Sequence, residues 1–178
     1  MCKKILLLVA LAWSLFACSR NEPTETTEDD FLNCKYSAPE PIFTASTAGI
    51  ISHQFELQTQ VGIERVEWEN GLQLTIQQQG CNEIVQFFEF RVNGKFNELP
   101  EAHWVQQTGQ YFYYIGSTDE QYLPLYEWGE LMIQNASIIS LGKDFEVYPD
   151  FFIQVAKKTF EDHVLLVTRL ATTAQGIE

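Results

Sequence analysis

Two runs of alternating apolar and polar residues, joined by Asn70-Gly71, constrain the fold of this chain more than any other feature. The runs extend from Val66 to Ile76, and apolar side chains occupy every second position on each side of the Asn-Gly pair. Such alternation is typical of half-buried strands. Asn-Gly between alternating runs is the strongest short-range indication of a β-hairpin. The segment therefore predicts two antiparallel strands.

The length of the loop decides which residues pair across this hairpin. A two-residue loop would pair Trp68 with Gln73 and so set apolar against polar residues. A three-residue loop, 69–71, pairs Trp68 with Leu72 and keeps the apolar residues on one face. Because a slip of one residue would turn the whole apolar set toward solvent, we predict the three-residue loop, with Gly71 left-handed at a bulge.

Other segments also favour strands. Residues 54–61 alternate, and 83–92 (EIVQFFEFRV) carry apolar side chains at both odd and even positions. The latter pattern predicts a sheet covered on both faces, at least in part. Residues 151–160 and 164–171 are β-rich and flank the short stretch 161–163, which predicts a C-terminal hairpin.

The middle of the chain favours helices. Leu99-Pro100-Glu101 is typical of a helix start, and Gly109 is a candidate end for that helix. Ser117 and Glu120 have the spacing of a capping box for a second helix. Pro124 follows closely, so this second helix is expected to begin near Leu123.

The order of these segments predicts the fold class. Residues 131–141 could continue the second helix or form a strand. Strands followed by helices and then strands indicate an α+β fold. We expect a mainly antiparallel sheet, with one or two helices inserted before the C-terminal β-hairpin.

The first eighteen residues have the layout of a secretory signal. Lys3 and Lys4 precede an apolar stretch, 5–16, and small Ala17 stands before Cys18. The stretch is shorter than the roughly 20 apolar residues that a membrane-spanning helix needs. Its end, Leu15-Phe16-Ala17-Cys18, resembles the lipobox of bacterial lipoproteins. That resemblance implies cleavage before Cys18 and diacylglycerol on its sulfur, while ordinary cleavage and release of a soluble protein is the alternative.

The signal divides the chain into three parts. Residues 1–17 are the expected signal peptide, and residues 18–30 comprise the lipidated cysteine and an acidic tether without large apolar residues. Such a segment is expected to be disordered, although an acidic sorting signal is the alternative. Residues 31–178 are long enough for one globular domain. The resemblance implies a bacterial cell envelope location, with the outer membrane, on its periplasmic or surface face, as the expected site.

Two cysteines remain in the mature domain, Cys34 and Cys81. In the oxidising compartment that the signal implies, we expect them to form a disulfide. The chain-entropy model assigns a loop of this length about 4 kcal/mol as an upper figure. Two buried free thiols are the alternative.

The strong acidity of the chain limits the classes of molecule that it can bind. Its formal net charge is −13, which argues against nucleic acid, whose phosphates need a basic footprint. It permits fast, salt-sensitive association with a cationic protein. We therefore expect the chain to have two partners. One is the lipid bilayer, which it would contact through acylated Cys18, and the other is a protein of positive charge.

Catalytic motifs are missing from the sequence. His53, His103 and His163 each stand alone, and the sequence contains no HExxH, CxxC or Gly-x-Ser-x-Gly pattern. It also has no Gly-rich phosphate loop. We expect no metal site, no cofactor and no enzymatic activity. A hydrolase whose catalytic residues are dispersed along the chain is the alternative.

Aromatic residues gather between positions 110 and 128, where they could pack in the core or form a recognition surface. Tyr and Trp are enriched at binding hot spots, so the candidate contact residues are Tyr111, Tyr113, Tyr122, Tyr126 and Trp128. The leading expectation is a non-catalytic binding module, such as an inhibitor or immunity protein for a cationic hydrolase or toxin. A scaffold for envelope assembly is the second expectation.

Overall fold

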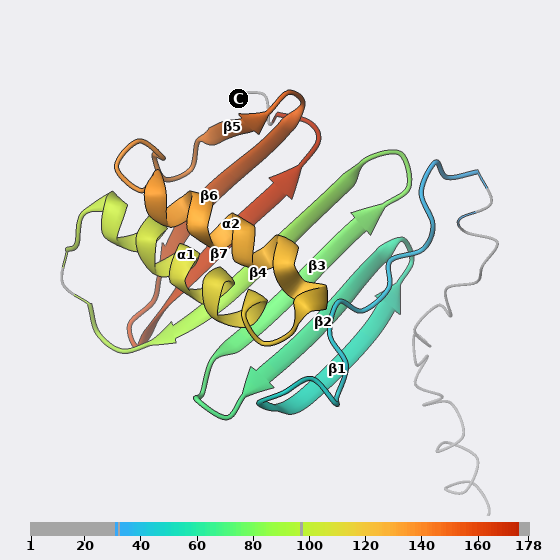
Figure 1. Ribbon diagram of the computed structural model, residues 1–178, viewed down its shortest axis with the longest axis horizontal. Helices are drawn as coiled ribbons and strands as arrows, with labels where there is room; N and C mark the ends of the chain where they lie inside the picture. Colours follow the sequence, from blue (N-terminus) through green and yellow to red (C-terminus); the bar gives the residue numbers. More distant parts are fainter. Residues whose placement is uncertain (1–30, 32, 97, 175–178) are drawn as a thin grey trace, which may run out of the picture.

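One antiparallel sheet of seven strands carries two α-helices on one face (Figure 1). The computed structural model describes residue 31, residues 33–96 and residues 98–174. The expected signal peptide 1–17, the lipidated Cys18 and the acidic tether 19–30 lie outside the described residues. The elements are β1 (Ile50–Gln58), β2 (Val61–Trp68), β3 (Gln73–Gly80), β4 (Ile84–Asn93), α1 (Glu101–Gly116), η2 (Glu120–Tyr122), α2 (Leu123–Gln134), β5 (Asp144–Tyr148), β6 (Phe151–Thr159) and β7 (His163–Ala171).

The strand order is β1-β2-β3-β4-β7-β6-β5, so the last three strands are added to the first four in reverse order. The two groups meet where β4 pairs antiparallel with β7, with Phe88 opposite Thr168 and Phe90 opposite Leu166. Every pairing in the sheet is antiparallel. This arrangement confirms the α+β class and the mainly antiparallel sheet.

The predicted hairpin register is confirmed. Val66 lies opposite Leu74, and the amide of Trp68 donates to the carbonyl of Leu72 over 3.0 Å. Gly71 has a φ of +82°, the left-handed conformation that glycine adopts without steric cost. The C-terminal hairpin is also confirmed, since β6 and β7 pair up to Thr159 opposite Val164.

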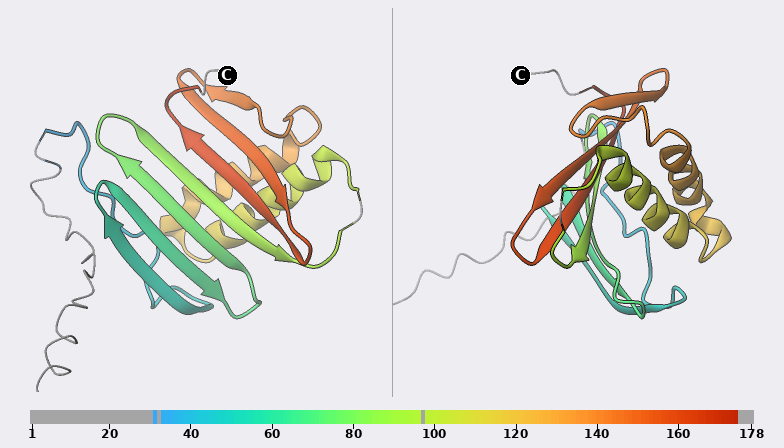
Figure 2. Two further views of the ribbon diagram at one scale, coloured as in Figure 1. Left: turned by 180° about the vertical axis from the view of Figure 1, so that it is seen from behind. Right: turned by 90° about the vertical axis from the view of Figure 1, so that its left-hand side faces the viewer.

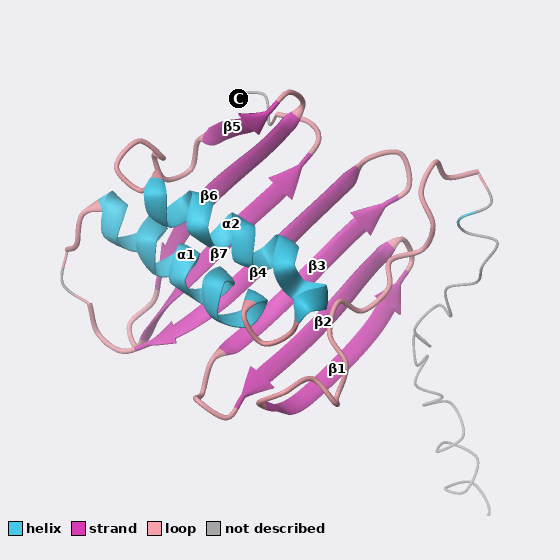
Figure 3. Cartoon of the chain, in the orientation of Figure 1, coloured by secondary structure: helices cyan, strands magenta, loops and turns pink. Residues whose placement is uncertain are grey.

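The core lies between the sheet and the helices (Figure 3). Phe112 of α1 packs its ring 4.9 Å from that of Phe88 and 5.3 Å from that of Phe90. The buried strand residues that face the helices include Val66, Trp68, Leu74, Ile76, Phe88, Phe90, Ile153, Val155 and Leu166. Alternation along each strand thus places one apolar set under the helices.

The other face of the sheet is open (Figure 2). In the described part of the chain no helix covers it. Arg169 and Ala171, which lie on this face opposite Phe87 and Val85, are nevertheless only 5% and 1% exposed, and Arg169 donates to the carbonyl of Thr173. The expected partial cover of both faces is therefore present at this end of the sheet, although no helix provides it. Val85 and Phe87, on this face, are only partly buried.

Helix α1 does not end at Gly109 but continues to Gly116. A Cβ atom at Gly109 would lie 2.9 Å from the carbonyl oxygen of Gly129 in α2. Gly109 therefore serves close helix packing and not helix termination, which corrects the prediction. Neither α1 nor α2, the α-helices among the described residues, is long and apolar enough to cross a membrane.

The start of α2 at Leu123 is confirmed, but the turn that precedes α2 is not capped by the predicted capping box. Asp119, not Ser117, caps the preceding turn η2, since its side chain accepts from the amide of Gln121. Ser117 instead follows the last turn of α1. Because α2 ends at Gln134 and turns follow, a strand over 131–141 is excluded, and the short strand β5 was not predicted.

The predicted disulfide is present between Cys34 and Cys81, whose Cα atoms lie 4.4 Å apart. The amide of Tyr36 donates to the carbonyl of Cys81 over 3.0 Å. These bonds tie the segment that precedes β1 to the turn between β3 and β4.

Candidate functional site

Three of the five aromatic residues singled out from the sequence pack into the fold. Tyr122 is only 3% exposed, so its ring offers little surface to a partner. Tyr111 stacks on Phe90 at 5.2 Å between ring centroids, and burial raises the pKa of its phenol. Trp128 is partly buried and stacks on Phe151 at 4.8 Å. These three contribute to the core rather than to an open surface.

The other two, Tyr113 and Tyr126, meet on the outer surface of the helical layer. Their ring centroids lie 4.4 Å apart, and their phenol oxygens lie 3.3 Å apart. Tyr126 Oη is also 3.4 Å from Glu130 Oε1. The hydrogen bond with Tyr113, followed by desolvation and the charge of Glu130, raises the pKa of Tyr126 to about 12. At neutral pH the phenol therefore keeps its proton and remains a hydrogen-bond donor.

Glycines bring these two tyrosines together. A Cβ atom at Gly129 would lie 2.4 Å from the amide nitrogen of Tyr113, and one at Gly116 would lie 2.1 Å from the amide nitrogen of Tyr126. Only glycine permits such backbone contact between α1 and α2. Glycine inside a helix costs about 1 kcal/mol relative to alanine, so Gly129, inside the second expected helix, is a sequence signal of close helix packing.

The helical layer carries only negative formal charge. Its acidic residues are Glu101, Asp119, Glu120, Glu127 and Glu130, and the sequence from 101 to 134 contains no lysine or arginine. Tyr113 and Tyr114 are 41% and 38% exposed, which is high for aromatic rings. We call the surface formed by Tyr113, Tyr126, Glu127 and Glu130 the acidic tyrosine face.

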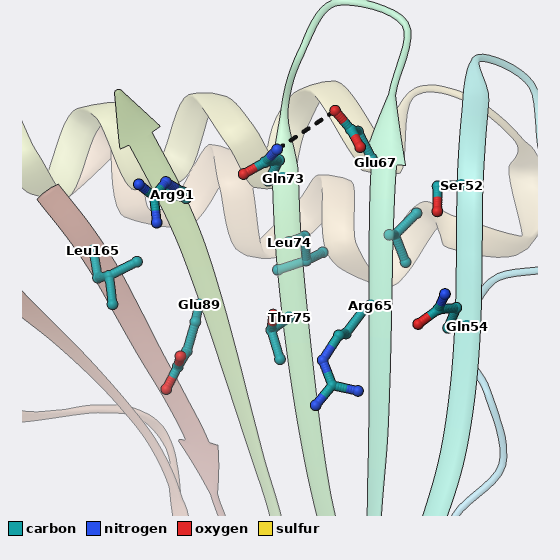
Figure 4. Close-up of a pocket in the computed structure, with 11 residues that line it drawn as sticks. Ser52, Gln54, Arg65, Glu67, Gln73, Leu74, Thr75, Glu89, Arg91 and Leu165 are labelled. Atoms are coloured by element: carbon teal, nitrogen blue, oxygen red, sulfur yellow. Dashed lines mark hydrogen bonds between the residues drawn. The ribbon is translucent and has the colours of Figure 1, made fainter. Parts of the chain in front are cut away.

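A second surface lies on the opposite side of the molecule, on the open face of the sheet (Figure 4). A shallow depression of about 390 Å³ there is lined mostly by polar and charged residues of β1 to β4, together with Leu165 of β7. Four of them form what we call the charge quartet, which consists of Arg65, Glu67, Glu89 and Arg91. In the sequence these residues are indistinguishable from an ordinary solvated strand face, because only the register shows how they lie relative to one another.

A buried carboxylate lies under the edge of the sheet. Glu64 is fully buried and accepts hydrogen bonds from the amides of Ile42 and Phe43, each over 2.8 Å. Its Oε1 also lies 2.8 Å from His53 Nε2. The two amide contacts hold the segment before β1 against the sheet, and the His53 contact joins β1 to β2. The pairing of Glu64 with His53 therefore has a structural explanation.

His163 forms the second histidine–carboxylate pair. Its Nδ1 lies 2.7 Å from Asp162 Oδ1, and this hydrogen bond lowers the pKa of the Asp162 carboxyl. Among the described residues no serine hydroxyl hydrogen-bonds to His53 or His163. The same part of the chain contains no group of three or more His, Cys, Asp or Glu side chains placed to hold a metal ion.

The described residues thus present two solvent-facing surfaces, the acidic tyrosine face on the helices and the charge quartet on the open sheet. The first is aromatic and uniformly acidic, and the second is polar with balanced charge. The chain matches no family model, no curated protein and no solved structure.

Proposed function

We propose that this chain is a non-catalytic binding module, held at the bacterial envelope by lipid on Cys18, and that its acidic tyrosine face recognises a cationic protein. An inhibitor or immunity protein that caps a basic hydrolase or toxin is the concrete form of this proposal. The observation that carries it is the close pairing of Tyr113 and Tyr126 beside Glu130, in a layer that contains no lysine or arginine.

The chemistry of this face suits lysine and arginine side chains. Tyrosine rings attract cations placed over their faces, and the carboxylates of Glu127 and Glu130 accept hydrogen bonds from the same groups. Because the Tyr113–Tyr126 pair is already ordered by backbone contact, a partner does not have to restrict those side chains on binding. The acidic layer around the pair would also steer a cationic protein toward it.

Binding to a defined basic protein tests the proposal. The full chain is titrated by calorimetry with a basic lysozyme-type muramidase at 20, 50 and 150 mM NaCl, and muramidase activity on cell walls is followed in parallel. We expect salt-sensitive binding that the double variant Glu127→Gln/Glu130→Gln weakens at least tenfold. Tyr113→Ala should also weaken it, because the ring that pairs with Tyr126 is lost.

A matched control distinguishes binding at the acidic tyrosine face from a general effect of the chain's negative charge. Glu146→Gln/Glu161→Gln changes the net charge by the same amount at exposed positions outside the helical layer. If the control loses as much affinity as Glu127→Gln/Glu130→Gln, the acidic tyrosine face is not the site. Absence of binding at 20 mM NaCl contradicts a basic muramidase as the partner of this face.

Anchoring is tested separately by the Cys18→Ser variant. The parent chain should sediment with membranes and be released only by detergent, whereas Cys18→Ser should be recovered without detergent, because a chain without acyl groups has no anchor. Equal sedimentation of both proteins would contradict lipidation at Cys18.

A further inference from the structure

The charge quartet forms a checkerboard on the open face of the sheet. Arg65 on β2 and Glu89 on β4 lie in one row of the register, on either side of Thr75. Glu67 and Arg91 lie in the next row, on either side of Gln73.

Opposite charges therefore occupy neighbouring corners and like charges occupy the diagonals (Figure 4). The corners are roughly 10 Å apart across the strands and roughly 7 Å apart along them.

Such a pattern is complementary to itself. A two-fold axis that lies in the interface along β3 places Arg65 of one copy over Glu89 of the other, and Glu67 over Arg91. An axis perpendicular to the strands places Arg65 over Glu67 and Glu89 over Arg91. A diagonal axis would oppose like charges. Both favourable axes keep the strands of the two sheets aligned, which is a common way for sheets to pack face to face.

We propose that two copies of this chain pair through the open faces of their sheets, with the charge quartets in contact about a two-fold axis. The argument is one of charge complementarity. Two chains with a net charge of −13 repel each other over most of their surfaces, and the helical layer has no lysine or arginine. The quartet combines two arginines with two glutamates, so it is a region where two acidic copies can approach without net repulsion.

The contacts that the quartet makes within the chain are long or exposed to solvent. Gln73 donates to Glu67 over 3.4 Å, and Arg91 donates to Asn93 over 3.0 Å at an exposed position. Arg65 lies 3.4 Å from Glu56, with both side chains about half exposed, and Arg91 lies 3.7 Å from Asp162. Exposed pairs of this kind contribute little, so a partner can compete with them. Glu89 has no hydrogen bond or ion pair within the described residues.

The open face is also large enough. With the axis along β3, five strands of each copy overlap: β1, β2, β3, β4 and β7. Strands about 4.8 Å apart that rise about 3.3 Å per residue give these five a face of roughly 700 Å². A standard interface buries about 800 Å² on each partner. Partly exposed Phe87, Leu165 and Val167 lie on this face beside the quartet and would supply apolar contact. The interface is isologous, as in most homodimers.

Charge reversal gives a sharp test. Sedimentation velocity on the detergent-solubilised full chain, from 1 to 100 µM at 50 mM NaCl, should show a dimer that dissociates as salt is added. With the axis along β3, Arg65→Glu alone and Glu89→Arg alone should each weaken dimerisation at least tenfold. An equimolar mixture of these two variants should dimerise again, because every reversed charge then meets its complement. The double variant Arg65→Glu/Glu89→Arg should also dimerise.

The perpendicular axis predicts a different rescue, in which Arg65→Glu pairs with Glu67→Arg. Circular dichroism and thermal melting check that each variant is folded, and Glu120→Lys on the helical layer is the control that should leave dimerisation unchanged. A parent chain that stays monomeric at 100 µM overturns the proposal. The proposal is also overturned if Arg65→Glu and Glu89→Arg each leave dimerisation unchanged. It is overturned as well if Arg65→Glu fails to dimerise both with Glu89→Arg and with Glu67→Arg.

Discussion

Gly129→Ala measures how closely the two helices must approach to build the acidic tyrosine face. The new Cβ atom would lie 2.4 Å from the amide nitrogen of Tyr113 and 2.7 Å from the carbonyl oxygen of Gly109. Both atoms belong to the backbone, so no side-chain rotation relieves the contact and the helices must separate.

The expected change in stability combines two opposing effects. Alanine is favoured over glycine in a helix by about 1 kcal/mol. Overpacking a well-filled contact costs about 1 to 3 kcal/mol, and a clash with backbone atoms belongs at or above the upper end of that range. The net result is a loss of about 2 kcal/mol in the free energy of unfolding, which for a domain of this size lowers Tm by roughly 4 to 8 °C.

Thermal unfolding followed by circular dichroism measures this loss. Gln110→Ala, at an exposed position of α1, is the control and should change the free energy of unfolding by less than about 0.5 kcal/mol. Separation of Tyr113 from Tyr126 should also lower the pKa of Tyr126 from about 12 toward its ordinary value of 10.0. An unchanged or higher Tm for Gly129→Ala would refute the close crossing of the helices.

Three further predictions concern stability and titration. Glu64→Ala should reduce the free energy of unfolding in urea by about 3 to 5 kcal/mol, because two backbone amides and a histidine lose their buried acceptor; a loss under 1 kcal/mol would contradict this. Replacing both Cys34 and Cys81 with serine should cost about 2 to 4 kcal/mol, measured by the same denaturation. Tyr126 should titrate by tyrosinate absorbance near its raised pKa of about 12, and Glu130→Gln should lower that pKa. Since the raised pKa favours the neutral phenol, its contribution to stability is complete below pH 10 and is lost as the pH rises toward 12.

Local patterns in the sequence determined the elements whose physical causes are local. The alternation around Asn70-Gly71 predicted both strands of that hairpin and the left-handed Gly71, because side-chain period and turn chemistry act within a few residues. The start of α2 near Leu123 followed from Pro124 in the same way. The disulfide was predictable because Cys34 and Cys81 are the one pair of cysteines outside the expected signal and lipidation site.

Tertiary structure alone decided the features that depend on contacts between distant segments. The pairing of β4 with β7 joins residues such as Val85 and Ala171 and could not be read from either strand. The continuation of α1 through Gly109 depends on a neighbouring helix whose backbone fills the space of the missing side chain.

The two candidate surfaces also depend on contacts between distant segments. The sequence grouped five aromatic residues, but burial separated Tyr122 from the exposed Tyr113. The checkerboard of charges exists only because hydrogen bonding between β2, β3 and β4 sets Arg65 in register with Glu89. Alternation along one strand determines which face a side chain occupies, whereas pairing between strands determines its neighbours on that face.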